Sequence, residues 1–157
     1  MSSIEIKVMP AELADEPGVM GLLNEAGLPL AGVHEHLAGF VVARRAGQIV
    51  GVAGLEAYGD QGLLRSVVVT PDQRETGLGR RLVEAVLAAA RQRRLRSLTL
   101  LTETAAAYFP RFGFRPVARA EVAGALASSE EFRGACPESA VALRLDLAEA
   151  AEATDHE

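Results

Sequence analysis

The sequence has no tryptophan, two tyrosines, five phenylalanines and a single cysteine among its 157 residues. With so few aromatic side chains, the core must be built mainly from Leu, Val and Ala, and apolar residues at 49% of the chain suffice for one globular domain. The single cysteine, Cys136, excludes a disulfide within the chain, so nothing here favours an oxidising compartment.

Long hydrophobic runs are also missing, and the N-terminus lacks the basic-then-apolar pattern of a secretory signal. We therefore expect a cytoplasmic protein with no membrane partner. The net charge of −5 disfavours general nucleic-acid binding, which depends on neutralising phosphates. Between Arg74 and Arg96, however, seven arginines accompany only two acids, Glu75 and Glu84, and this basic segment could meet a polyanionic ligand.

Apolar periodicity predicts a mixed α/β domain with one central sheet. The predicted strands cover 4–9, 40–43, 48–58, 63–70, 97–101, 114–117 and 140–147, and the predicted helices cover 15–27, 33–37, 77–93 and 104–112, with 121–133 irregular or helical. Strands 63–70 and 97–101 with the long helix between them form one crossover unit, which should be parallel and right-handed, whereas the other strands are mostly antiparallel. The domain should span residues 1–147, and the Ala/Glu-rich tail 148–157 should be disordered.

The segment from Val67 to Arg80 carries the strongest functional signal. A β-branched strand ends at Pro71, a loop with two glycines follows, and the long helix begins there. Amides at a helix N-terminus bind anions, and Arg74 and Arg80 would add charge-assisted hydrogen bonds. An ordinary strand-to-helix turn has the same spacing. The triphosphate P-loop is excluded because no Gly-Lys-Ser/Thr is present, and the dinucleotide fingerprint because no third glycine follows Gly79.

The same loop resembles that of a known family. Arg74-x-x-Gly77-x-Gly79 is similar to the Arg/Gln-x-x-Gly-x-Gly/Ala loop of the GNAT acetyltransferases, and Phe112-Gly113-Phe114 matches a later element of that family. The resemblance covers about residues 4–147 and implies a GNAT fold, the cofactor acetyl-CoA and acetyl transfer to an amine, with no metal. It implies that the strand main chain pairs with the pantetheine arm and that the loop amides hold the pyrophosphate. The implied cofactor-binding residues are Val67, Val68, Val69, Arg74, Glu75, Thr76, Gly77, Leu78, Gly79, Arg80, Thr104 and Ala107.

Two residues depart from the family pattern. Glu75 stands where the family usually has glycine, and because a carboxylate would repel pyrophosphate we expect its side chain to point to solvent. Phe109 stands four residues before Gly113, where many members have a tyrosine that protonates the leaving thiolate, and a phenyl ring cannot do this. Tyr108 is the remaining candidate acid, although one step along a helix turns a side chain by about 100°. Alternatively, the thiolate leaves without an acid.

Two charged residues in apolar strands are candidates for the part of the site that binds and deprotonates the acceptor amine. Glu56 is the candidate general base that takes the amine proton, in many such enzymes through water, and the alternative is an exposed carboxylate at a strand end. Arg65 could bind an acidic group of the substrate, and the alternative is a surface ion pair, for example with Glu56. Ser66 and His34 are further candidates for substrate contact, although exposed histidines without a function are common.

A closer resemblance concerns short motifs. Four motifs resemble the N-acetyltransferases associated with arsenic-resistance operons: Gly54-Leu55-Glu56-x-Tyr58-Gly59-Asp60, Leu63-Leu64-Arg65-Ser66, Thr104–Ala107 and Cys136-Pro137-x-Ser139-Ala140. Members of that broader group acetylate amino-acid-like toxins such as arsinothricin and phosphinothricin, which implies a small-molecule acceptor. The alternatives are a peptide or protein N-acetyltransferase and a module that binds acyl-CoA without turnover, which Phe109 favours. An exposed final strand could pair two chains into a homodimer.

Overall fold

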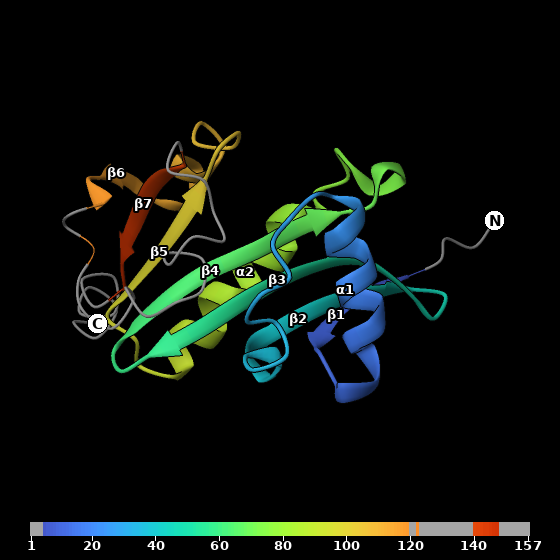
Figure 1. The fold of residues 1–157 in the computed structure, drawn as a ribbon. Helices are drawn as coiled ribbons and strands as arrows, with labels where there is room; N and C mark the ends of the chain where they lie inside the picture. Colours follow the sequence, from blue (N-terminus) through green and yellow to red (C-terminus); the bar gives the residue numbers. More distant parts are fainter. Residues whose placement is uncertain (1–4, 120–121, 123–139, 148–157) are drawn as a thin grey trace, which may run out of the picture. The chain divides into compact units, whose positions relative to one another are not determined.

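The computed structural model describes residues 5–119, 122 and 140–147. Its main elements are β1 (Ile6–Pro10), α1 (Glu16–Glu25), β2 (Phe40–Arg45), β3 (Gln48–Tyr58), β4 (Gln61–Val69), α2 (Leu78–Gln92), β5 (Ser97–Thr102), β6 (Arg115–Val117) and β7 (Val141–Asp146) (Figure 1). Four short 3-10 turns add η1 (Leu13–Asp15), η2 (Leu37–Gly39), η3 (Pro71–Gln73) and η4 (Phe109–Phe112). The predictions for 121–133, except at Val122, and for the tail 148–157 lie outside the described residues.

The strands form one sheet with the order β1-β2-β3-β4-β5-β7-β6. The pair β4–β5 is parallel over Gln61–Leu63 and Ser97–Thr99, whereas β1–β2, β2–β3, β5–β7 and β6–β7 are antiparallel. The predicted mixed α/β fold and its single parallel crossover through α2 are therefore confirmed.

The last strand does not lie at an edge of the sheet. Strand β7 pairs with β5 along its whole length and with β6 from Ala142 to Arg144. The proposed route to a homodimer through an exposed final strand is therefore wrong, because both sides of β7 are already paired. The edge is taken by β6, which has three residues and contains Pro116, a combination that disfavours further strand pairing.

The chain folds as two compact units. The N-terminal unit contains Met1–Leu55 and Ser66–Ala89, and the C-terminal unit contains Glu56–Arg65 and Ala90–Glu157. Strands β3 and β4 pass through both units, as does α2.

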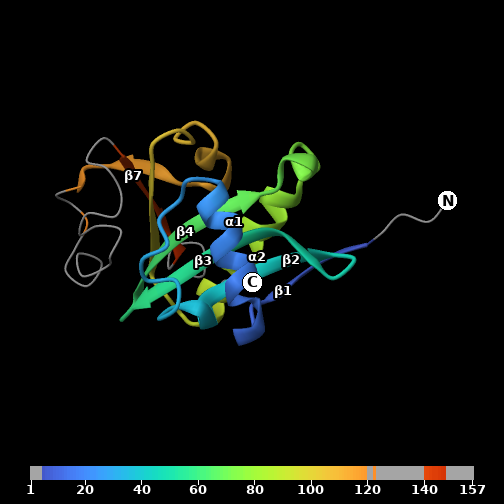
Figure 2. The ribbon, with the colours of Figure 1, turned by 45° about the vertical axis from the view of Figure 1, so that its right-hand side comes forward.

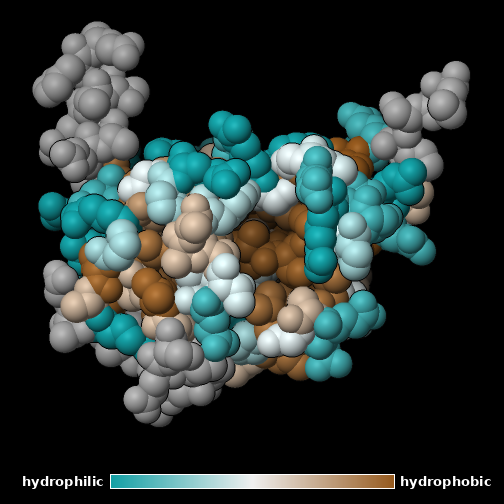
Figure 3. Space-filling view, turned by 90° about the horizontal axis from the view of Figure 1, so that it is seen from above, coloured by the Kyte–Doolittle hydropathy of each residue, from teal (hydrophilic) through white to brown (hydrophobic). Residues whose placement is uncertain are grey.

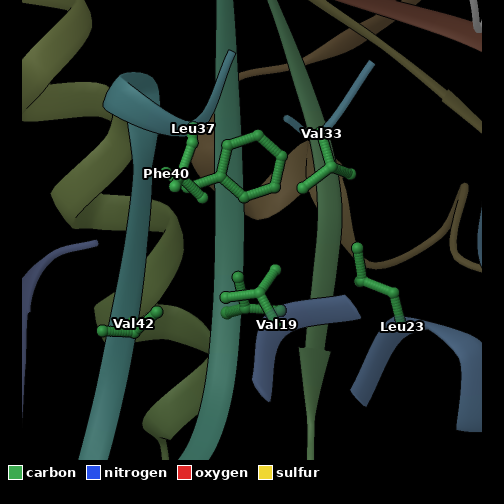
Figure 4. Packing of buried hydrophobic residues seen from close by; sticks show 7 residues of the cluster. Val19, Leu23, Val33, Leu37, Phe40 and Val42 are labelled. Atoms are coloured by element: carbon green, nitrogen blue, oxygen red, sulfur yellow. The ribbon is translucent and has the colours of Figure 1, made fainter. Parts of the chain in front are cut away.

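The two helices of the N-terminal unit cover opposite faces of its strands (Figures 1 and 2). On one face, Val19 and Leu23 of α1 are fully buried in a cluster with Phe40 and Val52 (Figure 4). On the other face, a Cβ added at Gly51 would lie 2.8 Å from Leu82 Cδ1, so α2 approaches β3 where no side chain intervenes. The apolar residues of α2 recur at helical spacing and are all buried: Leu78, Leu82, Val83, Val86, Leu87 and Ala90.

Both ends of α1 have a residue type that favours helix capping, but only one of these residues caps the helix. At the C-terminal end, Gly27 has φ +73°, its amide donates to Asn24 O, and Leu28 N donates to Leu23 O, which is a Schellman motif. At the N-terminal end, Asp15 occupies the cap position without capping the helix. Its buried carboxylate instead accepts hydrogen bonds from Arg44 Nη2 at 2.5 Å and Glu12 N at 2.7 Å.

The Asp15–Arg44 pair predicts a contribution to acid unfolding. Burial raises the pKa of Asp15, but the hydrogen bonds from Arg44 and Glu12 and the charge of Arg44 outweigh it, so the folded pKa is lowered. The stabilisation is therefore complete above the unfolded value of about 3.9 and is lost as pH falls through the folded pKa. We expect the acid limb of stability against pH to be shallower in Asp15→Asn than in the parent, measured by urea unfolding. Glu25→Gln, on the exposed end of α1, should leave the limb unchanged, and parallel curves for Asp15→Asn would contradict the assignment.

Two predicted helices are wrong. Residues 33–37 form consecutive turns that lead into η2, because too few residues separate Gly32 from β2 for a stable helix. Residues 104–112 form a turn followed by η4. Pro110 lacks an amide hydrogen and fits only the first turn of a helix, so the helical segment begins at Phe109 instead of running through it.

Few large apolar side chains are exposed. Among the described residues only Leu13 and Val141 belong to this class. On the face drawn in Figure 3, hydrophobic residues lie between stretches of hydrophilic residues. Within the described part of the chain, no helix combines the length and apolar character needed to cross a bilayer.

Candidate functional site

The predicted anion-binding loop joins β4 to α2 in the N-terminal unit. Arg81 N donates to Gly77 O at 3.1 Å, which is the first hydrogen bond of the helix. The amides of Leu78, Gly79 and Arg80 therefore come before the helical ladder and have no acceptor within the helix. The partial positive charge of the helix end adds to these donors, and the side chains of Arg74 and Arg80 are exposed beside them.

Side chains within the loop hold its shape. Thr70 Oγ1 donates to Asp72 Oδ1 at 2.6 Å, and Thr76 Oγ1 donates to Gln73 O at 2.6 Å, while Gln73 itself is buried. The hydrogen bond from Thr70 is the main cause that lowers the pKa of Asp72. The loop is thus ordered by its own contacts, which reduces the entropy lost when a ligand binds.

Two loop residues adopt left-handed backbone conformations. Gly77 has φ +85°, and Glu75 has φ +64° with an exposed side chain, as expected for a carboxylate that must avoid an anion. A non-glycine residue at such a φ is strained, so Glu75 has a backbone geometry that glycine would adopt more easily.

Strand β4 changes in backbone conformation and in burial at Ser66. This residue has φ +62° within the strand, a conformation typical of a β-bulge. Gly62–Arg65 before it are buried, whereas Ser66–Val69 after it are partly exposed. The predicted ligand-facing main chain of Val67, Val68 and Val69 therefore lies in the accessible part of the strand.

A buried polar cluster of three side chains lies in the C-terminal unit. Arg65 Nη1 donates to Glu56 Oε2 at 2.7 Å, and Tyr58 Oη donates to Glu56 Oε1 at 2.5 Å. The side chains of Glu56 and Arg65 are 0% exposed, whereas Tyr58 is half-buried. The carboxylate is therefore bonded at both oxygens, on one side by a buried cation and on the other by the hydroxyl of a half-buried tyrosine.

This cluster changes two interpretations drawn from the sequence. The exposed strand-end carboxylate considered for Glu56 is wrong, because the side chain is fully buried. The ion pair considered for Arg65 is present but buried, since its guanidinium donates to Glu56. Contact between Arg65 and an acidic substrate therefore stays a prediction. Tyr58 was named only as part of a motif, without a predicted role, although its position two residues after Glu56 on a strand places both side chains on one face.

The segment after β5 holds the other cofactor and acid candidates. Thr104 and Ala107 lie exposed in a turn, and the Tyr108 ring stacks under the Arg111 guanidinium at 4.2 Å. Phe109 is buried with its ring centroid 5.9 Å from that of Phe114. The substitution of phenylalanine for the family's tyrosine therefore fills an apolar cluster, where a hydroxyl would require a buried partner.

His34 is exposed in the N-terminal unit. Its Nδ1 lies 2.8 Å from Glu16 Oε1, and this hydrogen bond is the main cause that raises the pKa of His34. A pair of this kind ties the segment after α1 to the first turn of that helix. Contact of His34 with a substrate stays a prediction.

The family of this chain follows from its match to a known sequence profile. The sequence profile described as acetyltransferase (GNAT) domain matches residues 36–116, which include the β4–α2 loop. The chain belongs to the GNAT acetyltransferase family. GNAT enzymes use acetyl-CoA, so the predicted fold class, enzyme class and cofactor are confirmed at the level of the family. No group of three or more His, Cys, Asp or Glu that could hold a metal occurs in the described ranges.

Several known proteins are similar to this chain in sequence or in fold. The chain is 33% identical over 119 residues to an amino-acid acetyltransferase from Azotobacter vinelandii, an alignment that covers 70% of this chain and 28% of the relative. The fold is similar to N-acetylglutamate synthase from Neisseria gonorrhoeae complexed with coenzyme A and N-acetyl-glutamate, with TM-score 0.78 and 21% identity over 93% of this chain and 36% of that one. It is also similar to Rv2747 from Mycobacterium tuberculosis in complex with CoA, with TM-score 0.76 and 23% identity over 89% and 98% of the two chains. The chain thus spans about a third of the length of the first two relatives.

The loop of this GNAT chain fits the pyrophosphate of coenzyme A. Its helix amides lack intrahelical acceptors, two arginines are exposed beside them, and its backbone can approach an anion at Gly77. The exception is Glu75, whose charge is unfavourable near a phosphate but whose side chain lies at the surface.

Gly77→Ala tests the loop geometry. A Cβ at Gly77 meets nothing within 4 Å, so the strain comes only from φ +85° and should cost about 1 kcal/mol. Relief of that strain would move the helix amides, and we expect coenzyme A affinity measured by calorimetry to fall by about tenfold or more. Gly27→Ala is the matched control, since it places the same strain at the end of α1 and should leave the affinity unchanged. Equal affinities of both variants would contradict the role of the loop.

Proposed function

We propose that this chain is an acetyl-CoA-dependent N-acetyltransferase whose acceptor is the amine of a small acidic amino acid or a close analogue. The class includes glutamate, phosphinothricin and arsinothricin, the last two being acceptors of the arsenic-resistance-associated enzymes that the motifs resemble. The names of the relatives support an amino-acid acceptor, since one is an amino-acid acetyltransferase and another an N-acetylglutamate synthase. The catalytic domain would span residues 1–147.

The observation that carries the proposal is the carboxylate of Glu56, held by two donors inside the C-terminal unit. An amine must lose a proton before it attacks a thioester, and a fixed carboxylate can receive that proton. Each carboxylate oxygen keeps a second lone pair when it accepts one hydrogen bond, so the contacts with Arg65 and Tyr58 do not prevent this.

The other residues of the chain would bind and orient. Acetyl-CoA supplies the acetyl thioester. The loop residues 74–80 would hold its pyrophosphate, and the accessible main chain of Val67–Val69 would pair with its pantetheine arm. Tyr108 would protonate the departing thiolate, and if it does not, water serves as the acid.

Thiol release from acetyl-CoA tests the proposal. Glutamate, phosphinothricin, arsinothricin, a polyamine and a peptide with a free N-terminus form the acceptor panel, with products identified by mass spectrometry. We expect turnover with an acidic amino acid or analogue at least tenfold above the others. Preferred acetylation of the peptide would replace the small-molecule assignment. Coenzyme A binding, followed by calorimetry, without turnover of any acceptor would indicate a binding module.

A further inference from the structure

Glu56 is closed to direct contact with an acceptor. Its side chain is 0% exposed, and Arg65, which covers Oε2, is equally buried. A proton-accepting group must lie within hydrogen-bond reach of the proton donor or be connected to it through another group. For an amine bound at the protein surface, Glu56 alone therefore cannot serve as the base.

Tyr58 provides the connection. Its hydroxyl donates to Glu56 Oε1 at 2.5 Å, a distance typical of a strong hydrogen bond to a charged oxygen, while its side chain is half-buried. A tyrosine hydroxyl is both donor and acceptor, so it can pass a proton inward while receiving another from outside. The cluster thus has a buried carboxylate at one end and a half-buried tyrosine at the other.

We propose that Tyr58 relays the proton of the acceptor ammonium to Glu56, an inference that rests on the N-acetyltransferase function proposed above. The ammonium, directly or through one water, gives a proton to Tyr58 Oη as the Tyr58 hydroxyl proton moves to Glu56 Oε1. The neutral amine nitrogen then uses its lone pair to form the C–N bond to the acetyl carbon, and the C–S bond breaks. The nitrogen releases its second proton to solvent, and the thiolate takes a proton from its acid or from water, so that a neutral amide and a thiol are formed. Reversal of the relay returns the Glu56 proton to solvent.

Arg65 has a positioning role in this scheme. Its donation to Oε2 at 2.7 Å fixes the carboxylate plane and leaves Oε1 directed to the tyrosine. The buried cation also compensates the carboxylate charge in the resting state, which would otherwise be costly at this depth. Substrate recognition by Arg65 is not required.

Tyr58→Phe tests the relay, because it keeps the ring and removes only the hydroxyl. General acid–base groups contribute typically 10²–10⁴-fold, so we expect kcat to fall by about 100-fold, with coenzyme A affinity and melting temperature close to the parent values. Glu56→Gln should lower kcat similarly, and adding Tyr58→Phe to it should lower kcat no further, because the relay then has no end acceptor.

A proton inventory separates relay from positioning. Rates in mixtures of H₂O and D₂O should give a curved dependence in the parent enzyme, where two protons move together, and a straight line in Tyr58→Phe. A rate loss that keeps the curvature would overturn the relay and leave Tyr58 as a residue that only orients Glu56. Turnover of Tyr58→Phe within twofold of an active parent would overturn the relay alone, whereas an inactive parent overturns the proposed function with it.

Discussion

Arg65→Leu is expected to destabilise the protein by about 3–5 kcal/mol, because it leaves the Glu56 carboxylate buried without its cation. Both side chains of the pair are 0% exposed, so water cannot replace the lost donor without local opening. For a chain of this size the melting temperature should fall by roughly 10 °C. Urea unfolding followed by circular dichroism measures the difference in free energy directly.

The matched comparison is an ion pair on the surface of the same unit. Arg115 Nη2 lies 3.1 Å from Asp146 Oδ2, and the two side chains are 58% and 39% exposed. Arg115→Leu should cost less than about 1 kcal/mol, since water solvates the remaining carboxylate. The double variant Glu56→Gln/Arg65→Leu should recover most of the loss, because neither charge then remains unpaired. Equal losses for Arg65→Leu and Arg115→Leu would mean that Glu56 reaches solvent.

The part of the fold that the sequence predicts best is governed by local patterns. The spacing of Leu82, Val83 and Val86 follows one helical face, and all three side chains are fully buried. Pro71 after a β-branched run, with Gly77 just before that helix and Gly79 in its first turn, marks the loop in the same local way. The family resemblance of this loop agrees with the profile match, because both depend on residues close together in the chain.

The wrong predictions concern structural features that depend on contacts between residues far apart in the chain. Asp15 looks like a helix cap, but Arg44, 29 residues later, takes its carboxylate instead. The last strand is readily recognised, yet no local pattern tells that β7 inserts between β5 and β6.

The candidate base shows how far sequence reasoning reaches at the site. Glu56 and Arg65 stand out because each is a charge in an apolar strand, and an ion pair between them was one of the two interpretations. The burial of Glu56 and Arg65 depends on the other segments of the chain that pack over them. The sequence of the β3–β4 hairpin alone does not reveal those contacts. The Tyr58 hydroxyl completes the cluster. Its signals in the sequence were a place in a motif of the closer resemblance and the two-residue spacing from Glu56, and neither gave it a role.

Glu56→Gln is expected to lower kcat/KM for the acceptor by about 10²–10⁴-fold, because an amide cannot take the amine proton. The glutamine oxygen can still accept from Arg65 or Tyr58, so coenzyme A affinity should change little. Stability should fall, because the buried Arg65 cation then lacks its counter-charge, and rates are therefore compared below the melting temperature of the variant. The deficit should shrink as pH rises toward the pKa of the acceptor amine, since more of it then arrives already neutral.

The decisive measurement is the ratio of parent to Glu56→Gln rates across pH 6–10, with acetyl-CoA saturating. Glu25→Gln makes the same chemical change at an exposed position on α1 and should give a ratio near one at every pH. A large ratio for Glu56→Gln that stays constant over the whole range would contradict proton acceptance, because removal of a purely structural carboxylate slows neutral and charged acceptors alike. A ratio that falls toward one at high pH would identify Glu56 as the end of the proton path.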